Sequence, residues 1–276
     1  MFKNKKENGI LIAGIVLIAS LFVLNLKDAE VNTNSNNKLI SIKDFNESNN
    51  KSEKKEEKKE ELSEEEKEVQ LVNNIVKENK DNLVVLCNRN IKLGEEYNPT
   101  DLVVPNTPLV YPRTFEQSKL RKEAAQALEE MFKEAKKQGL EDLFLVSGYR
   151  SYKYQYQIYN NSLRNRGEAH TKKYMAEPGY SEHQTGLTAD ISTRSTGFTL
   201  EESFENTKEG QWLAENAHKF GFILRYPKDK VDVTGYTYEP WHFRYVGKTV
   251  SQYMKKYNLV LEELYDGVAV EVDAIG

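Results

Sequence analysis

The chain has 276 residues, of which 30% are charged and 38% hydrophobic, and its formal net charge is −4. This polarity excludes a polytopic membrane protein, while the length allows one sizeable core. The negative charge and the lack of a basic stripe with interleaved aromatic residues argue against nucleic acid as a partner. The single cysteine, Cys87, permits no internal disulfide; it lies in an apolar run and is expected to be a buried hydrophobic residue rather than a catalytic thiol.

The N-terminus has the pattern of a membrane anchor. Residues 1–8 carry three lysines, and residues 9–26 form an apolar run interrupted only by Ser20 and Asn25. About 18 apolar residues is the lower limit for spanning a bilayer, and preceding basic residues keep that end in the cytoplasm. A cleaved signal peptide is the alternative, but no small-residue cleavage pattern follows the run. We therefore expect a single-pass protein of the cell membrane with its domain outside, the alternative being secretion after cleavage.

Residues 27–80 are expected to be a charged spacer. The stretch 51–68 mixes lysine and glutamate with almost no apolar residue, so it cannot bury enough surface to offset the entropy lost on ordering. We expect the spacer to be disordered or a solvated helix that holds the following domain away from the membrane. The composition becomes globular from about residue 81, which places the domain at residues 81–276.

The domain alternates strand and helix patterns that are joined by long loops. Strands are expected at residues 82–91, 143–149, 187–192, 222–226 and 238–246. Helices are expected at residues 116–138, 152–163, 208–220, 249–257 and 259–265. Residues 97–111, with three prolines, and residues 174–186 are expected to be irregular. Because regular βαβ repeats are absent, this order indicates an α+β domain with a mixed or antiparallel sheet.

Two short motifs contain the residue types that a catalytic zinc site needs. The first contains His183 and Asp190, with six residues between them, and the second contains Glu239 and His242, with two residues between them. Zinc accepts histidine nitrogen and aspartate oxygen, and a catalytic site leaves one position to water. We therefore expect one Zn²⁺ per chain, held by His183, Asp190 and His242. Glu239 is then the candidate general base that acts on the water.

The second motif requires an irregular backbone. Pro240 disfavours a helix at Glu239, and in a regular strand the side chains of Glu239 and His242 would point to opposite faces. We therefore expect a twist or bulge where this strand begins. A buried structural histidine is the alternative for an isolated Trp-His pair, but the independent His-Asp motif favours the metal site. Arg150, at a glycine turn after a buried strand, is a candidate to stabilise the charge of a tetrahedral intermediate.

Three blocks of the sequence resemble those of the bacterial zinc D-alanyl-D-alanine carboxypeptidases of the VanY type and the related L,D-carboxypeptidases. The blocks are Ser-Gly-Tyr-Arg-Ser at residues 147–151, Ser-x-His-x-x-Gly-x-x-Ala-Asp at residues 181–190 and Glu-Pro-Trp-His at residues 239–242. The resemblance covers roughly residues 82–259. It implies a central antiparallel sheet flanked by helices, with the zinc ligands and base named above. It also implies a substrate pocket lined by Arg150, Gln155, Ser181 and Tyr226.

The expected function is hydrolysis of the terminal D-alanine from peptidoglycan stem peptides. Within the family, an L,D-carboxypeptidase that trims tetrapeptide stems, a peptidoglycan endopeptidase and a dipeptidase remain alternatives. A wall-binding scaffold without turnover is the alternative outside enzymes, although it would have lost a ligand or the base, and none is lost. A serine hydrolase is disfavoured because Ser147 and Ser181 have no separate His-Asp pair once the metal site has taken the histidines. The sequence identifies no protein partner.

Overall fold

The computed structural model describes residues 62–80 and 82–265 of the chain. The expected anchor at residues 9–26 and most of the expected spacer lie outside these residues. Within the described ranges, no helix is long and apolar enough to cross a membrane.

A four-stranded antiparallel sheet supports the rest of the domain. Its strands follow the order β3 (Leu143–Ser147), β4 (Thr188–Thr193), β6 (His242–Tyr245) and β5 (Phe222–Leu224). Every neighbouring pair is antiparallel. A separate antiparallel pair consists of β1 (Leu102–Val103) and β2 (Leu120–Arg121). The predicted α+β class with an antiparallel sheet is therefore confirmed.

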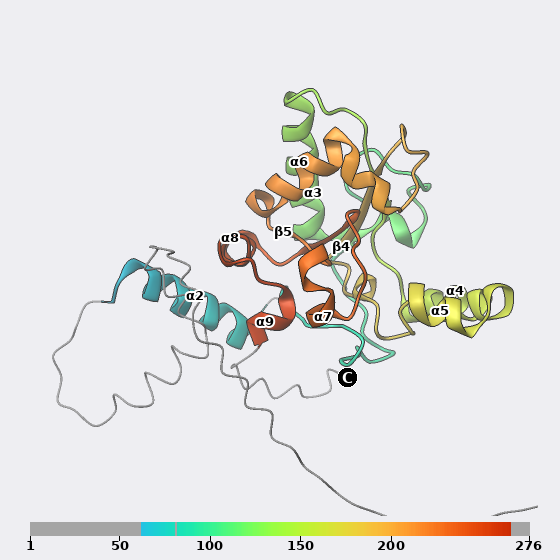
Figure 1. Ribbon diagram of the computed structural model, residues 1–276, viewed down its shortest axis with the longest axis horizontal. Coiled ribbons are helices and arrows are strands. Elements are labelled where there is room, and N and C mark those ends of the chain that lie inside the picture. The colour runs from blue at the N-terminus through green and yellow to red at the C-terminus, as the bar shows by residue number, and fades with distance from the viewer. Residues whose placement is uncertain (1–61, 81, 266–276) are drawn as a thin grey trace, which may run out of the picture. The chain divides into compact units, whose positions relative to one another are not determined.

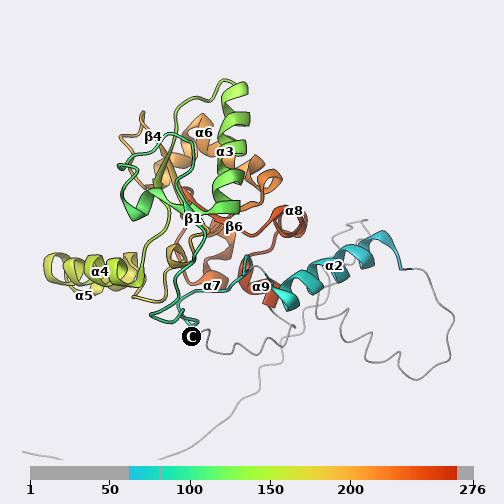
Figure 2. The ribbon, with the colours of Figure 1, turned by 180° about the vertical axis from the view of Figure 1, so that it is seen from behind.

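Helices flank this sheet (Figure 1). They are α2 (Glu64–Glu78), α3 (Lys122–Lys137), α4 (Tyr152–Arg166), α5 (Glu168–Tyr174), α6 (Lys208–Asn216), α7 (Val231–Thr234), α8 (Lys248–Tyr257) and α9 (Leu261–Tyr265). Short 3-10 helices are η1 (Glu116–Ser118), η2 (Glu182–Thr185), η3 (Glu202–Asn206), η4 (Ala217–Phe220) and η5 (Lys228–Lys230). Helices α4 and α5 lie side by side in both views (Figures 1 and 2). The Ser151 hydroxyl caps α4 by accepting a hydrogen bond from the backbone N–H of Tyr154.

One face of the sheet packs on the main hydrophobic core. Apolar residues recur at helical spacing along α3, and the buried ones include Leu128 and Met131. They belong to one cluster with Ala189 of β4 and Phe243 of β6, which are paired across the two strands. Since burying each large apolar side chain contributes about 1.5–3 kcal/mol, this cluster fixes which face of β4 and β6 turns away from the core.

Helix α2 occupies part of the range that we expected to be spacer. Ser63 and Glu66 form a capping box at its start, and Val69, Val72 and Val76 are buried along one side. This side belongs to a second hydrophobic cluster with residues of α8 and α9, beside which α2 lies in Figure 2. The folded unit therefore begins before residue 81, because the apolar valines follow directly on the charged stretch.

Residues 82–91 do not form the predicted strand. They make turns, although Val84, Val85 and Cys87 are buried as their apolar character indicates. The carbonyl of Val85 accepts a hydrogen bond from the Arg244 side chain at 2.8 Å instead of from a neighbouring strand. Cys87 donates from its thiol to the carbonyl of Gly179, and burial raises the pKa of this thiol to about 12, as expected for a packing residue.

The predicted helix at residues 116–138 begins later than expected, at Lys122. The backbone before it is used for other hydrogen bonds: the carbonyls of Gln117 and Lys119 accept from the N–H groups of Gly148 and Tyr149 at 2.7 Å each. A Cβ on Gly148 would lie 2.2 Å from the Lys119 carbonyl oxygen, so this close approach requires glycine. The contact fixes the chain just before Arg150.

Candidate active site and metal centre

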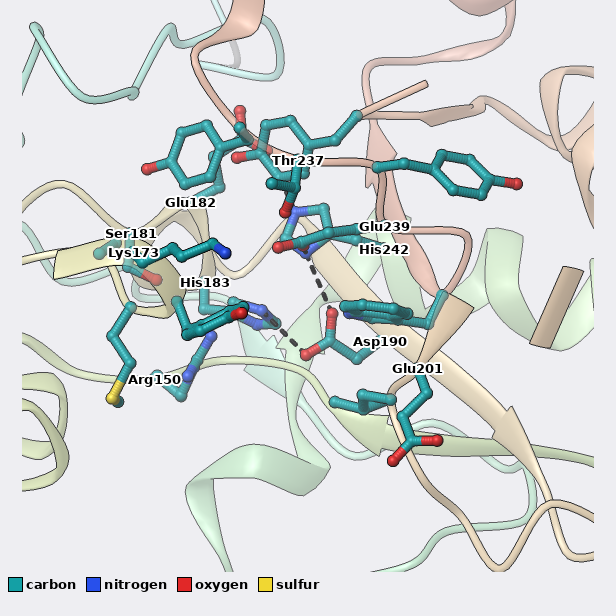
Figure 3. Close-up of a pocket in the computed structure, with 18 of the residues that line it drawn as sticks. Arg150, Lys173, Ser181, Glu182, His183, Asp190, Glu201, Thr237, Glu239 and His242 are labelled. Atoms are coloured by element: carbon teal, nitrogen blue, oxygen red, sulfur yellow. Dashed lines mark hydrogen bonds and ion pairs between the residues drawn. The ribbon is translucent and has the colours of Figure 1, made fainter. Parts of the chain in front are cut away.

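The three predicted metal ligands lie together on the polar face of the sheet. Asp190 of β4 and His242 of β6 are paired directly across the two strands. His183 comes from η2 in the loop before β4, where Gly186 ends the turn at a φ of 68°. The candidate ligand atoms of the three residues all lie within 4.8 Å of one another. Figure 3 shows the Asp190 carboxylate reaching toward both imidazoles.

The ring of His183 is held in one orientation by the backbone. Its Nδ1 lies 2.6 Å from the carbonyl oxygen of Gly148, which can only accept a hydrogen bond, so Nδ1 carries the proton. Nε2 is then left with a free lone pair and lies 3.1 Å from Oδ2 of Asp190. His183 therefore offers Nε2 to a metal.

His242 offers Nδ1 to a metal, whereas His183 offers Nε2. Its Nδ1 lies 3.0 Å from Oδ1 of Asp190 and 3.6 Å from Oε2 of Glu239, whereas its Nε2 faces away from Asp190, toward Glu182. Burial lowers the pKa of this imidazole, but its contacts with the carboxylates of Asp190 and Glu182 outweigh burial and raise its pKa to about 9. Without a metal the ring therefore holds a proton at Nδ1, where a cation would replace it.

Glu239 lies beside the cluster because the chain turns at this point. The backbone N–H of His242 donates to the Glu239 carbonyl at 3.1 Å, which closes a tight turn and brings both side chains to the same side. The predicted irregularity at the start of the strand is thus confirmed, and β6 begins at His242 rather than at residue 238. Burial raises the pKa of the Glu239 carboxyl to about 7, although His242 and Arg150 oppose the rise. A carboxylate with this pKa is suited to exchange protons near neutrality.

A cavity of about 460 Å³ opens over the cluster. All four predicted pocket residues line it: Arg150, Gln155, Ser181 and Tyr226. The Nε of Arg150 is buried and has no hydrogen-bond partner among the described residues, which leaves a donor for a ligand. The side-chain nitrogen of Gln155 is instead used within the protein, since it donates to the carbonyl of Ala176 at 2.7 Å. Tyr226 is buried, and its ring lies 4.7 Å from that of His242.

Three charged residues behind the cluster were missed from the sequence. Glu182 Oε1 accepts hydrogen bonds from Arg225 Nε at 2.7 Å and from Arg244 Nη1 at 3.0 Å, and the three side chains have no exposed surface. Arg225 also makes a bidentate pair with Glu262 of α9 at 2.6 and 2.7 Å. Arg225 lies within the apolar strand predicted at residues 222–226, and this feature could have indicated such a cluster, because a buried charge requires a partner.

The donor set fits a zinc ion. Two imidazoles and one carboxylate, whose side chains are each at most 7% exposed, place their ligand atoms within 4.8 Å of one another in the wall of the cavity. Catalytic zinc sites use such a set of three protein ligands and keep a fourth position open.

Known proteins are similar to this chain in sequence. The family VanY, D-alanyl-D-alanine carboxypeptidase, matches residues 117–248. YodJ of Bacillus subtilis (strain 168), which is named as a carboxypeptidase, is 46% identical over 208 residues, or 73% of this chain and 76% of YodJ.

Solved structures also match. The structure of the LdcB LD-carboxypeptidase matches with a TM-score of 0.65 and 47% identity, and the match covers 69% of this chain and 89% of the solved chain. A mutant of the vancomycin-resistance D,D-pentapeptidase VanY in complex with Zn(II) has a TM-score of 0.51 and 28% identity, covering 66% of this chain and 98% of that one. The chain therefore belongs to the VanY family of D-alanyl-D-alanine carboxypeptidases.

Proposed function

We propose that the protein is a zinc-dependent carboxypeptidase that removes the terminal D-alanine from peptidoglycan stem peptides. The observation that carries this proposal is the convergence of His183, Asp190 and His242 beside Glu239, at a cavity that also contains Arg150. Family membership supports the reaction class, and a relative solved with Zn(II) supports the metal.

Each residue of the site has a defined part in this reaction. Zinc held by His183, Asp190 and His242 would act as a Lewis acid and lower the pKa of a water molecule to about 7. Glu239 accepts a proton from the attacking water and later returns it to the leaving amine. Arg150 presents a fork of N–H donors that binds the terminal carboxylate of the peptide or the developing oxyanion. The buried side of the cavity, including Tyr226, restricts access of bulk water to these groups.

A second candidate is an L,D-carboxypeptidase that trims tetrapeptide stems. The observation that favours it is the likeness to LdcB, which is greater in both identity and TM-score than the likeness to the D,D-pentapeptidase VanY. The two activities differ in the configuration of the residue before the cleaved bond. The metal and base are needed for both, so the shape of the cavity decides between them.

Release of D-alanine from defined peptides tests the proposal. The full chain would be incubated with a pentapeptide ending in D-Ala-D-Ala, with the corresponding tetrapeptide and with free D-Ala-D-Ala, each with and without a chelator. We expect chelator-sensitive release from the pentapeptide. Preferred cleavage of the tetrapeptide would select the second candidate, and preferred cleavage of the free dipeptide would indicate a dipeptidase. No cleavage by zinc-loaded protein would contradict both carboxypeptidase activities and favour a wall-binding role.

We also propose that residues 9–26 hold the protein in the cell membrane with its domain outside. The support is the sequence alone: an apolar run of sufficient length that follows three lysines. Fractionation of cells that express the full chain, with N-terminal sequencing, tests this placement. We expect intact protein in the membrane fraction, whereas protein in the medium beginning near residues 27–31 would show cleavage and secretion.

A further inference from the structure

Two buried polar atoms beside the metal cluster face each other without a hydrogen-bond partner. Within the described part of the chain, neither Oε2 of Glu182 nor Nε2 of His242 makes a hydrogen bond. The two atoms lie 3.6 Å apart, and the Glu182 and His242 side chains are 0% and 7% exposed. One is an acceptor and the other can be a donor. Because buried polar groups are rarely left unsatisfied, their approach indicates that they pair.

The Glu182 carboxylate is fixed in place by other contacts. Its Oε1 takes both arginine hydrogen bonds, from Arg225 and Arg244, so Oε2 remains directed at His242. The two arginines are themselves anchored: Arg225 by Glu262, and Arg244 by the carbonyls of residues 83 and 85. The carboxylate thus has a single orientation, set by Arg225 just after β5, by Arg244 of β6 and by the contacts that anchor these two arginines.

We propose that Glu182 is a positioning residue for the metal ligand His242. It accepts the Nε2–H of the imidazole, which keeps the proton on that nitrogen and leaves the Nδ1 lone pair directed at the site formed with His183 and Asp190. Carboxylates that accept the second N–H of a ligating histidine orient the ring and raise its basicity. The inference rests on the proposed zinc site, but it assigns a role to a residue that is neither one of the three proposed ligands nor the proposed base.

Zinc affinity of matched variants tests this role. Glu182→Gln and Glu262→Gln each remove one carboxylate that pairs with Arg225, but only Glu182 faces His242. Competition with a chelator of known affinity would be measured on the full chain and both variants. We expect zinc affinity to fall about 10- to 100-fold in Glu182→Gln and to stay within a few-fold of the parent in Glu262→Gln. Equal losses in both variants, or no loss in either, would overturn the proposal, whereas a parent that binds no zinc would overturn the zinc site itself.

The parent protein alone gives a second test, which remains decisive where Glu182→Gln does not fold. The chain has only four histidines, so ¹⁵N-histidine labelling gives a spectrum that can be assigned by substitution. In the zinc-loaded protein we expect the His242 proton on Nε2, downfield and slow to exchange, and the His183 proton on Nδ1. A His242 proton on Nδ1, or an Nε2 proton in rapid exchange with water, would show that Glu182 does not hold the ring.

Discussion

The two faces of the β4–β6 strand pair are both buried, but by opposite means. On one face, Ala189 and Phe243 are paired and fully enclosed by apolar side chains. On the other face, Asp190 is paired with His242, and Arg244 lies two residues along. The apolar face is stabilised by exclusion of water, whereas the polar face depends on charge pairing and hydrogen bonds. Substitutions on the first face should therefore reduce stability, and substitutions on the second should remove function.

Removal of a metal ligand on the polar side should have the largest effect. We expect His183→Ala to lose both zinc and measurable hydrolysis, because a three-residue site reduced to two ligands no longer encloses the ion. Metal content by mass spectrometry and D-alanine release measure the two losses, with circular dichroism as the control for folding. Stoichiometric zinc in the folded variant would contradict the ligand assignment.

Substitution of Glu239 on the same face should reduce catalysis but leave metal binding intact. We expect Glu239→Ala to keep zinc but to lose turnover by about 10² to 10⁴, which is typical for loss of a general base. Measurement of kcat together with zinc content distinguishes the base from a ligand. Turnover within a few-fold of the parent would place the base elsewhere.

Arg150 should matter through the geometry of its donors rather than through its charge. Arg150→Lys keeps a cation but not the planar fork, so we expect kcat/KM on peptides with a free terminal carboxylate to fall by about 10². The same peptides with an amidated terminus are the control. Equal kcat/KM values for Arg150→Lys and the parent would exclude bidentate recognition.

Phe243 tests the opposite, apolar face of the same strand. We expect Phe243→Ala to lower the free energy of unfolding by about 3–5 kcal/mol, because a fully buried ring is replaced by a cavity. Denaturant unfolding measures this change. The folded fraction should still bind one zinc, so loss of the metal from folded protein would show that the two faces are not separable.

The apparent affinity for zinc should also depend on pH, and this effect should be smaller than those of the substitutions above. Because the pKa of His242 without metal is about 9, zinc must displace a proton at any pH below that value. We therefore expect the apparent affinity to fall by about tenfold for each pH unit between 8 and 6. Chelator competition at several pH values measures the slope, and an affinity independent of pH would mean that no proton leaves the site.

The sequence predicts the apolar face better than the polar one. The alternation of apolar and polar residues at 187–192 correctly predicts that Ala189 and Asp190 lie on opposite faces of the strand. The two sequence motifs identify the metal cluster that the structure brings together. Alternation cannot indicate that the polar face is also buried, because burial depends on the elements that cover it. All six residues of β4 are in fact buried.

The missed features depend on contacts between distant parts of the chain. Glu182 meets Arg225 and Arg244 only after β4, β5 and β6 have assembled, and no local pattern shows that pairing. The segment at 82–91 has strand-like composition, yet an arginine side chain takes the place of a neighbouring strand.

The central claim is that the polar face holds zinc between His183, Asp190 and His242. Anomalous diffraction at the zinc absorption edge, from crystals of the zinc-loaded protein, tests it most directly. We predict one peak about 2.0–2.2 Å from Nε2 of His183, a carboxylate oxygen of Asp190 and Nδ1 of His242. A peak at any other group of residues, or bound through Nε2 of His242, would contradict the account.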